Sequence, residues 1–282
     1  MFGSGIMINS KYISVIIVTH DNFSTKSGCI KSVLLSISQQ QYCNYEIIII
    51  DNASKSNDKK MLYQITQKVK NIRLVSSDIN NIAMARNIGA EIANGEYLLF
   101  MDDDTVLTSS RALHTVSQYF NEGHYGYAAN RYWTKPYWYE KNIDFLEDSI
   151  QKDDMSGIIF NIPDPQTRGK DKVRHLVKSY IGNFGFVHKG TLFKIGGWNE
   201  SYIGYGCEDD ELAFMLYMEY GRPVLLRDID ILHIWHPLKT TNYLELEQNQ
   251  RRFRAVLDQH SVKIFHIGRL LYGEETVLDY QK

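Results

Sequence analysis

The first hundred residues alternate short apolar runs with amphipathic stretches. Residues 13–19 (ISVIIVT) and 46–51 (EIIIID) are rich in β-branched side chains, which is typical of strands that a parallel sheet buries on both faces. Between them, residues 26–40 predict a helix, because apolar positions recur at spacings of three and four. These positions are Ile30, Val33, Leu34 and Ile37.

The same alternation continues with expected helices at 59–69 and 83–93 and expected strands at 72–76 and 97–101. A strand, a helix and a second parallel strand make one crossover unit. The sequence therefore predicts an α/β fold, a Rossmann-like and mostly parallel central sheet with helices on both faces.

Beyond residue 104 the pattern is less regular. Residues 125–142 are dense in tyrosine and tryptophan but follow neither the period of a strand nor that of a helix. The polar stretch 161–175 is typical of a surface loop. The remaining expected elements are regular structure at 182–188, a turn-rich segment at 196–206, a helix at 208–220, strands at 224–226 and 229–235, and an amphipathic helix at 242–257.

Charge and cysteine content narrow the classes of function. Lys and Arg total 31 against 33 Asp and Glu, so the net charge of -2 argues against binding to a nucleic-acid backbone. Three scattered cysteines argue against a disulfide scaffold and favour a reducing compartment, and we expect the cytoplasm. No run approaches the roughly 18 to 20 apolar residues of a membrane span, and no signal peptide is visible.

The strongest local signal is an acidic triplet, Asp102, Asp103 and Asp104, directly after the apolar run 97–101. Ligands of open α/β sheets gather at the carboxyl ends of strands. Three adjacent acids repel one another, so the triplet makes sense if a hard divalent cation, Mn²⁺ or Mg²⁺, neutralises it and bridges to a diphosphate. We expect the chain to turn here, with Asp104 on the metal and Asp102 on the metal through water or on a nucleotide sugar. The alternative is a solvated turn that caps a helix.

A second acidic cluster, Glu208 to Glu211, follows a glycine-rich stretch. Acids in a first helical turn also favour the helix dipole, which is the simpler explanation. A carboxylate at such a position can instead take the proton of an attacking hydroxyl, and Asp209 is the residue expected to do so, with Glu208 beside it. His233 and His236 end a late apolar run, and one of them is expected to give the metal a nitrogen ligand, although their spacing does not decide which.

Four segments in this order resemble the family 2 glycosyltransferases with the GT-A fold. They are IIVTHD, EIIIIDNAS, AMARNIGAEIANGEYLLFMDDD and GGWNESYIGYGCEDDEL, and together they span about residues 13–236. The last segment also resembles the C-terminal catalytic part of galactosyltransferases and N-acetylgalactosaminyltransferases. The resemblance implies a metal-dependent transfer of a hexose or N-acetylhexosamine from a UDP-sugar to an acceptor hydroxyl.

The resemblance also implies roles for particular residues. The strand ends would bring Thr19, Asp21, Asp51 and Ser54 to the nucleotide, with Asp51 on the uracil edge. Further contacts to the nucleotide sugar are expected from Arg86, Asn87, Asp102, Asp103 and Trp198. The metal ligands would come from Asp102, Asp104, His233 and His236, and Asp209 would act as the base.

These roles imply a domain organisation. We expect one GT-A domain at 13–241, with a nucleotide-binding half at 13–104 and an acceptor and catalytic half at 105–241. Residues 242–282 are expected to form a C-terminal helical extension, and residues 1–12 a tag or disordered start.

Several alternatives stay open. A base at Asp209 predicts inversion at the anomeric carbon, but the GGWNE segment also resembles retaining transferases. A nucleotidyltransferase would need a glycine-rich, basic loop after the first strand, where this chain reads THDNFSTKSG. The aromatic segment 125–139 would suit a non-catalytic carbohydrate-binding protein. The acceptor is open among a glycan, a lipid-linked sugar and a peptide, and so is the oligomeric state. Arg251, Arg252 and Arg254 form either a solvated helix face or a contact to the inner face of a membrane.

Overall fold

The computed structural model describes residues 11–120, 124–158, 181–237, 242–260, 262–263 and 279–280. The expected loop at 161–175, the start of the chain up to residue 10 and most of the tail past residue 268 lie outside the described residues. Among the described helices, none combines the length and the apolar character needed to cross a bilayer.

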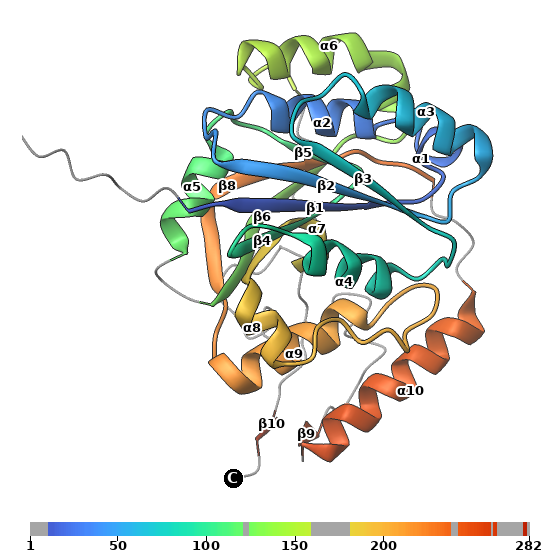
Figure 1. Cartoon of the computed structure of the whole chain (residues 1–282), viewed down its shortest axis with the longest axis vertical. Coiled ribbons are helices and arrows are strands. Elements are labelled where there is room, and N and C mark those ends of the chain that lie inside the picture. Colours follow the sequence, from blue (N-terminus) through green and yellow to red (C-terminus); the bar gives the residue numbers. More distant parts are fainter. Residues whose placement is uncertain are drawn as a thin grey trace, which may run out of the picture.

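Eight strands form one sheet, in the spatial order β3-β2-β1-β4-β7-β6-β8-β5 (Figure 1). Neighbours are parallel at β3/β2, β2/β1, β1/β4 and β6/β8, and antiparallel at β4/β7, β7/β6 and β8/β5. The strand bounds are β1 (Ile13–Thr19), β2 (Tyr45–Asn52), β3 (Ile72–Ser77), β4 (Tyr97–Asp102), β5 (Thr105–Leu107), β6 (Tyr125–Trp133), β7 (Gly185–His188) and β8 (Val224–His233).

Helices cover both faces of this sheet, as the sequence predicts (Figure 1). One face carries α2 (Ile30–Ser38), α5 (Ala112–Tyr119) and α6 (Trp138–Lys152). The other carries α4 (Ile82–Ile92), α8 (Lys189–Lys194) and α9 (Glu208–Tyr220). The isoleucines of β2 alternate between two buried clusters, with Ile47 and Ile49 in one and Ile48 and Ile50 in the other. This alternation explains why the strand is apolar at every position.

The other elements are α1 (Asn22–Thr25), α3 (Ser56–Thr66), α7 (Ile181–Phe184), α10 (Tyr243–Gln259) and a ribbon of β9 (Val262–Lys263) with β10 (Asp279–Tyr280). Helix α10 packs on α9 through a small apolar cluster that includes Phe214, Phe253 and Leu257. The Asn242 side chain caps α10 by accepting from the Leu244 and Glu245 amides. The described part of the expected helical extension therefore begins with a helix packed on the domain.

Some segments differ from what the sequence predicts. Residues 125–142 contain a strand and then a helix, and a register shift between Ala128 and Asn130 further disturbs the alternation in β6. The two strands predicted at 224–226 and 229–235 are one strand, β8, whose apolar pattern is interrupted by exposed Arg227 and Asp228 at the same irregularity. The helix predicted at 26–40 begins at Ile30, because Ser27 and Gly28 take positive φ angles of 55° and 70°.

Candidate active site

The carboxyl ends of β1, β2 and β4 lie side by side and carry the acids that the sequence singles out. Thr19 pairs with Asp51 across β1 and β2, and Val18 pairs with Asp102 across β1 and β4. This edge of a parallel sheet is the usual place for a ligand in an α/β fold. The structure therefore brings the residues expected to face the nucleotide and the acidic triplet to the same edge.

Hydrogen bonds connect three of the four expected nucleotide contacts at the strand ends, and the fourth, Thr19, bonds to the triplet. The Asp21 amide donates to Ser54 Oγ at 2.8 Å, and the Ser54 amide donates to Asp51 Oδ1 at 3.2 Å. Thr19 Oγ1 donates to Asp103 Oδ2 at 2.6 Å. Three of these side chains are buried, and Ser54 is half-buried. A direct contact of each with a nucleotide stays a prediction.

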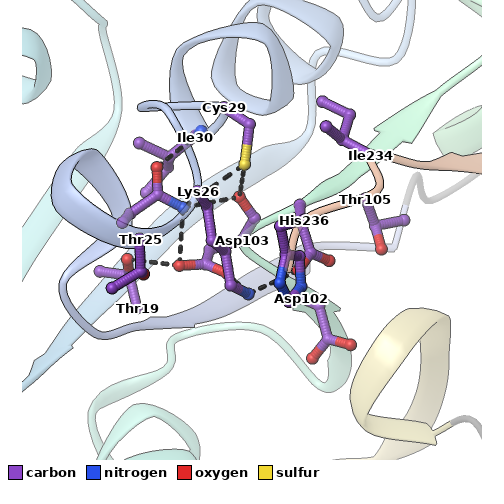
Figure 2. Close-up of polar contacts among 12 residues, drawn as sticks. Thr19, Thr25, Lys26, Cys29, Ile30, Asp102, Asp103, Thr105, Ile234 and His236 are labelled. Carbon is purple, nitrogen blue, oxygen red and sulfur yellow. Dashed lines mark hydrogen bonds and ion pairs between the residues drawn. The ribbon is translucent and has the colours of Figure 1, made fainter. Parts of the chain in front are cut away.

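The triplet turns as predicted, and the carboxylates of Asp102 and Asp103 point in different directions (Figure 2). Asp102 ends β4 and accepts from Asn183 Nδ2 at 2.8 Å. Asp103 points the other way, into the segment between β1 and α2, where it accepts from Asn22 Nδ2 at 2.8 Å. Asp104 is buried and faces the end of β8. Each acid of the triplet therefore has a different set of neighbours.

Asp104 meets both late histidines. His233 Nε2 lies 3.2 Å from Asp104 Oδ1, and His236 Nε2 lies 3.1 Å from Asp104 Oδ2. One ligand atom from each of the three residues falls within 4.8 Å of the others. Among the described residues these atoms form a group suited to one metal ion, and the group takes in both histidines where the sequence left the choice open.

The hydrogen bonds of the two histidines show which ring nitrogen of each faces Asp104. His233 Nδ1 lies 3.1 Å from the Ile234 carbonyl oxygen, and His236 Nδ1 lies 3.1 Å from the Pro237 carbonyl oxygen. A carbonyl oxygen only accepts, so each Nδ1 donates in its contact, and Nε2 is the ring nitrogen that faces the carboxylate. Asp104 Oδ1 is buried, and no group in the described part of the chain donates a hydrogen bond to it.

The imidazole of His233 is neutral at ordinary pH, so its contact with Asp104 Oδ1 is not an ion pair. Burial lowers the pKa of His233 to about 3, aided by the nearby charges of Arg131 and Lys26 and opposed by Asp104. A neutral imidazole and a carboxylate oxygen whose lone pairs face each other attract a cation placed between them. Two imidazole nitrogens and a carboxylate fit Mn²⁺ by their chemistry.

Asp102 is not part of this group. Its Oδ1 lies 3.6 Å from Arg86 Nη2, and its side chain is 33% exposed. Burial and the charge of Asp104 raise the pKa of Asp102, partly offset by Arg86. Of the roles expected for Asp102, contact with a nucleotide sugar suits this position better than direct metal ligation.

Arg86 joins the triplet to the second acidic cluster. Its buried guanidinium reaches Glu208 Oε1 and Asp209 Oδ1, each at 3.3 Å, as well as Asp102. Burial, together with Glu208 and Asp102, raises the pKa of Asp209 well above its ordinary value, although Arg86 acts in the opposite direction. Asp209 therefore has the raised basicity that suits a proton acceptor.

Trp198 and Asn87 are two further residues that we expect to contact the nucleotide-sugar donor. Trp198 is 1% exposed, and its ring packs under the Arg86 guanidinium at 4.3 Å. Asn87 donates to the Trp198 carbonyl oxygen at 2.9 Å and to Glu200 Oε1 at 2.7 Å. In this structure Trp198 packs against Arg86, and Asn87 holds the 196–206 segment. A direct contact of either residue with a nucleotide sugar stays a prediction.

Three site residues have no clear signal in the sequence. Lys26 bridges Asp103 and Asp104, at 2.6 and 2.5 Å, although a lysine at the start of a predicted helix is typical of a solvated position. Asn183 joins Asp102 to Thr105 Oγ1, which lies 2.8 Å away. Gly182 is the third, since a Cβ there would lie 2.1 Å from Arg86 Nη2 and 2.8 Å from Asp209 Oδ1.

Replacing Gly182 by alanine should therefore displace Arg86. We expect the free energy of unfolding to fall by about 1–3 kcal/mol from overpacking, and kcat/KM to fall about 10- to 100-fold. Chemical denaturation and steady-state kinetics measure the two effects. Gly190→Ala in α8 is the matched control, because its nearest neighbour would lie 3.3 Å away. A Gly182→Ala protein with unchanged kinetics would separate this glycine from the site.

The fold and the site together define a GT-A type glycosyltransferase, and comparison with known proteins gives the family. The Glycosyl transferase family 2 profile matches residues 14–192, which is more than half of the chain. The chain therefore belongs to glycosyl transferase family 2, a family of transferase enzymes.

Known relatives agree with this assignment. The putative colanic acid biosynthesis glycosyl transferase WcaA of Escherichia coli K12 is 35% identical over 106 residues, which cover 37% of this chain and 37% of that protein. The match therefore spans little more than a third of that relative's length.

Two solved structures share the fold at low sequence identity. Staphylococcus aureus TarS residues 1–349 in complex with UDP-GlcNAc matches with a TM-score of 0.57 at 14% identity, over 88% of this chain and 67% of that one. The mannosyltransferase PcManGT of Pyrobaculum calidifontis, in complex with GDP-Man and Mn²⁺, matches with a TM-score of 0.57 at 15% identity, over 88% and 65%. These matches confirm the predicted GT-A fold.

Proposed function

We propose that this chain moves a hexose or N-acetylhexosamine from a nucleotide diphosphate sugar to an acceptor hydroxyl, with a divalent cation bound at Asp104, His233 and His236. One observation carries the proposal. The three ligand atoms and the Arg86-linked acids Asp102 and Asp209 meet at the carboxyl edge of one sheet. In this proposal residues 13–104 hold the donor and residues 105–241 complete the site.

The chain's own groups divide the chemistry between them. Asp209 takes the proton of the attacking hydroxyl as its oxygen bonds to the anomeric carbon. Arg86 holds Asp209 and Asp102 at fixed positions, since its buried guanidinium contacts both. Asp104, His233 and His236 would hold a divalent cation, whose positive charge would stabilise the departing diphosphate. A single displacement of this kind inverts the anomeric centre, whereas a retaining transferase would keep it, and proton NMR of the first product distinguishes the two.

For the donor we propose a UDP-sugar, for which the TarS complex with UDP-GlcNAc is the structural parallel. The resemblance of the 196–212 segment to galactosyl- and N-acetylgalactosaminyltransferases makes UDP-galactose and UDP-GalNAc the first sugars to test. The acceptor is proposed to be a glycan, a lipid-linked sugar or a peptide. The name of the WcaA relative makes polysaccharide biosynthesis the first setting to examine.

A donor panel tests the proposal. The purified protein is heated with UDP- and GDP-sugars, each with Mn²⁺ or with EDTA, and donor hydrolysis is followed in parallel. We expect at least one sugar nucleotide to raise the melting temperature and to be hydrolysed in Mn²⁺ but not in EDTA. If no sugar nucleotide does so, the proposed function is wrong.

The pH dependence gives a finer prediction about Asp209. A base must be deprotonated, so activity is lost as pH falls through its pKa, and the raised pKa places this acid limb above the ordinary aspartate value of 3.8. Glu208→Gln removes a negative charge that raises the pKa of Asp209, so the limb should move to lower pH. The kcat–pH profile measures the shift.

The control for this measurement lies at the other end of the same helix. Glu219 pairs with Lys194 at the surface, so Glu219→Gln should leave the limb where it is. A limb that stays in place or moves upward in Glu208→Gln would rule out Asp209 as the group that titrates.

A further inference from the structure

Lys26 is held firmly by the turn between α1 and α2. Its backbone amide donates to the Asn22 carbonyl oxygen at 2.8 Å, and the Asn22 side chain in turn donates to both the backbone and the side chain of Asp103. The Lys26 side chain is only 20% exposed. Figure 2 shows it reaching from this turn towards Asp103 and the end of β4, where His236 also lies. The lysine is therefore part of the site and not a surface cation.

Lys26 contacts Asp104 as well as Asp103. Asp103 Oδ2 accepts from Thr19 Oγ1 and Asn22 Nδ2, and Lys26 Nζ donates to the other oxygen, Oδ1. The shorter contact of the ammonium is with Asp104 Oδ2, at 2.5 Å, and the same oxygen lies 3.1 Å from His236 Nε2. The lysine thus occupies one oxygen of the residue that the metal group depends on.

The two oxygens of Asp104 are divided between different partners. Oδ2 faces Lys26, whereas Oδ1 is buried, faces His233 Nε2 and accepts no hydrogen bond from any described residue. A cation held by Asp104 and the two imidazoles would lie near the ammonium, because Asp104 contacts both histidines and Lys26. The two like charges would repel each other strongly, because the site is buried and poorly screened.

On the basis of the proposed function, we propose that Lys26 acts as a built-in counter-ion of the metal site. Its positive charge weakens the binding of a divalent ion in the absence of a nucleotide. Asp103 and Asp104 with Lys26 carry a net charge of -1, and a divalent ion held by neutral imidazole ligands would change this to +1. The negative charges of a diphosphate remove the excess. Metal and nucleotide sugar therefore load together, and each strengthens the binding of the other by the same factor.

The test measures the binding of Mn²⁺ alone, from the electron paramagnetic resonance signal of the free ion. In Lys26→Met the dissociation constant for Mn²⁺ should fall at least about tenfold, since a repulsive charge at this range is removed. Lys26→Arg keeps the charge and should bind Mn²⁺ as the unaltered protein does. Lys31→Met, on the exposed side of α2, is the matched control and should change nothing.

A second variant keeps the test clear of folding defects. In Lys26→Gln the positive charge disappears, while the side-chain amide can still donate a hydrogen bond to Asp103 or Asp104. Melting temperatures in EDTA show that each variant is folded. If folded Lys26→Gln binds Mn²⁺ no more tightly than the unaltered protein, the role of Lys26 is wrong while the metal site stands. If neither protein binds Mn²⁺ at all, the metal site and the role of Lys26 are both wrong.

Discussion

Replacing Asp209 by asparagine should lower kcat by about 10²- to 10⁴-fold, the range that a positioned general base contributes. The substitution keeps the shape of the side chain, and Arg86 keeps its contacts with Glu208 and Asp102. The dissociation constant of the donor should therefore change little. Stopped assays of transfer measure kcat, and calorimetry with the sugar nucleotide measures donor binding.

Asp210, the next residue of the same helical turn, provides the comparison. Its charge contributes to the raised pKa of Asp209, whereas the Arg86 guanidinium pairs with Asp209 and Glu208. Asp210→Asn should keep activity within about tenfold of the unaltered protein. If Asp210→Asn loses more activity than Asp209→Asn, the base has been assigned to the wrong residue.

Replacing Asp104 by alanine should weaken Mn²⁺ binding at least about 100-fold, because even residues that only support metal ligands cost 10- to 100-fold when changed. The variant loses the carboxylate that faces both imidazoles and leaves Lys26 with Asp103. Transfer activity should fall with it and should not return at millimolar Mn²⁺. Titration calorimetry with Mn²⁺, with and without UDP, measures the loss.

Asp148→Ala is a suitable control for this experiment. Asp148 lies on α6, where it forms an exposed ion pair with Lys152. Asp104, by contrast, is buried. Its replacement should change neither Mn²⁺ binding nor stability by a measurable amount, since exposed pairs contribute about 0–1 kcal/mol. Equal Mn²⁺ affinity in Asp104→Ala and Asp148→Ala would remove Asp104 from the metal site.

The first half of the fold is readable from the sequence because its signals are local. Strands β1, β2 and β4 are continuous apolar runs, and the bounds of α4 and α9 agree with the prediction within a residue or so. The second half is harder because irregular backbone breaks the periods. The bulge that joins β6 and β8 disturbs the pattern in both strands, and the pairing that produces it links residues about a hundred positions apart.

The site shows the same division. The triplet, the acids that begin α9 and the late histidines stand out because several chemically suited residues occur close together in the sequence. Lys26, Gly182 and Asn183 stand out in no such way, because their importance comes from contacts with residues distant in the sequence, Lys26 with Asp103, Asn183 with Asp102 and Gly182 with Arg86. Trp198 is a different case: the resemblance implies a contact with the nucleotide sugar, which stays a prediction, and in this structure the ring is buried beneath Arg86.

The metal ligands are the centre of this account, and pulsed electron paramagnetic resonance of the Mn²⁺-loaded protein examines them most directly. We predict modulation from two imidazole nitrogens, of which one disappears in His233→Ala and one in His236→Ala. A manganese spectrum without nitrogen couplings, or with couplings that survive in both variants, would contradict the account.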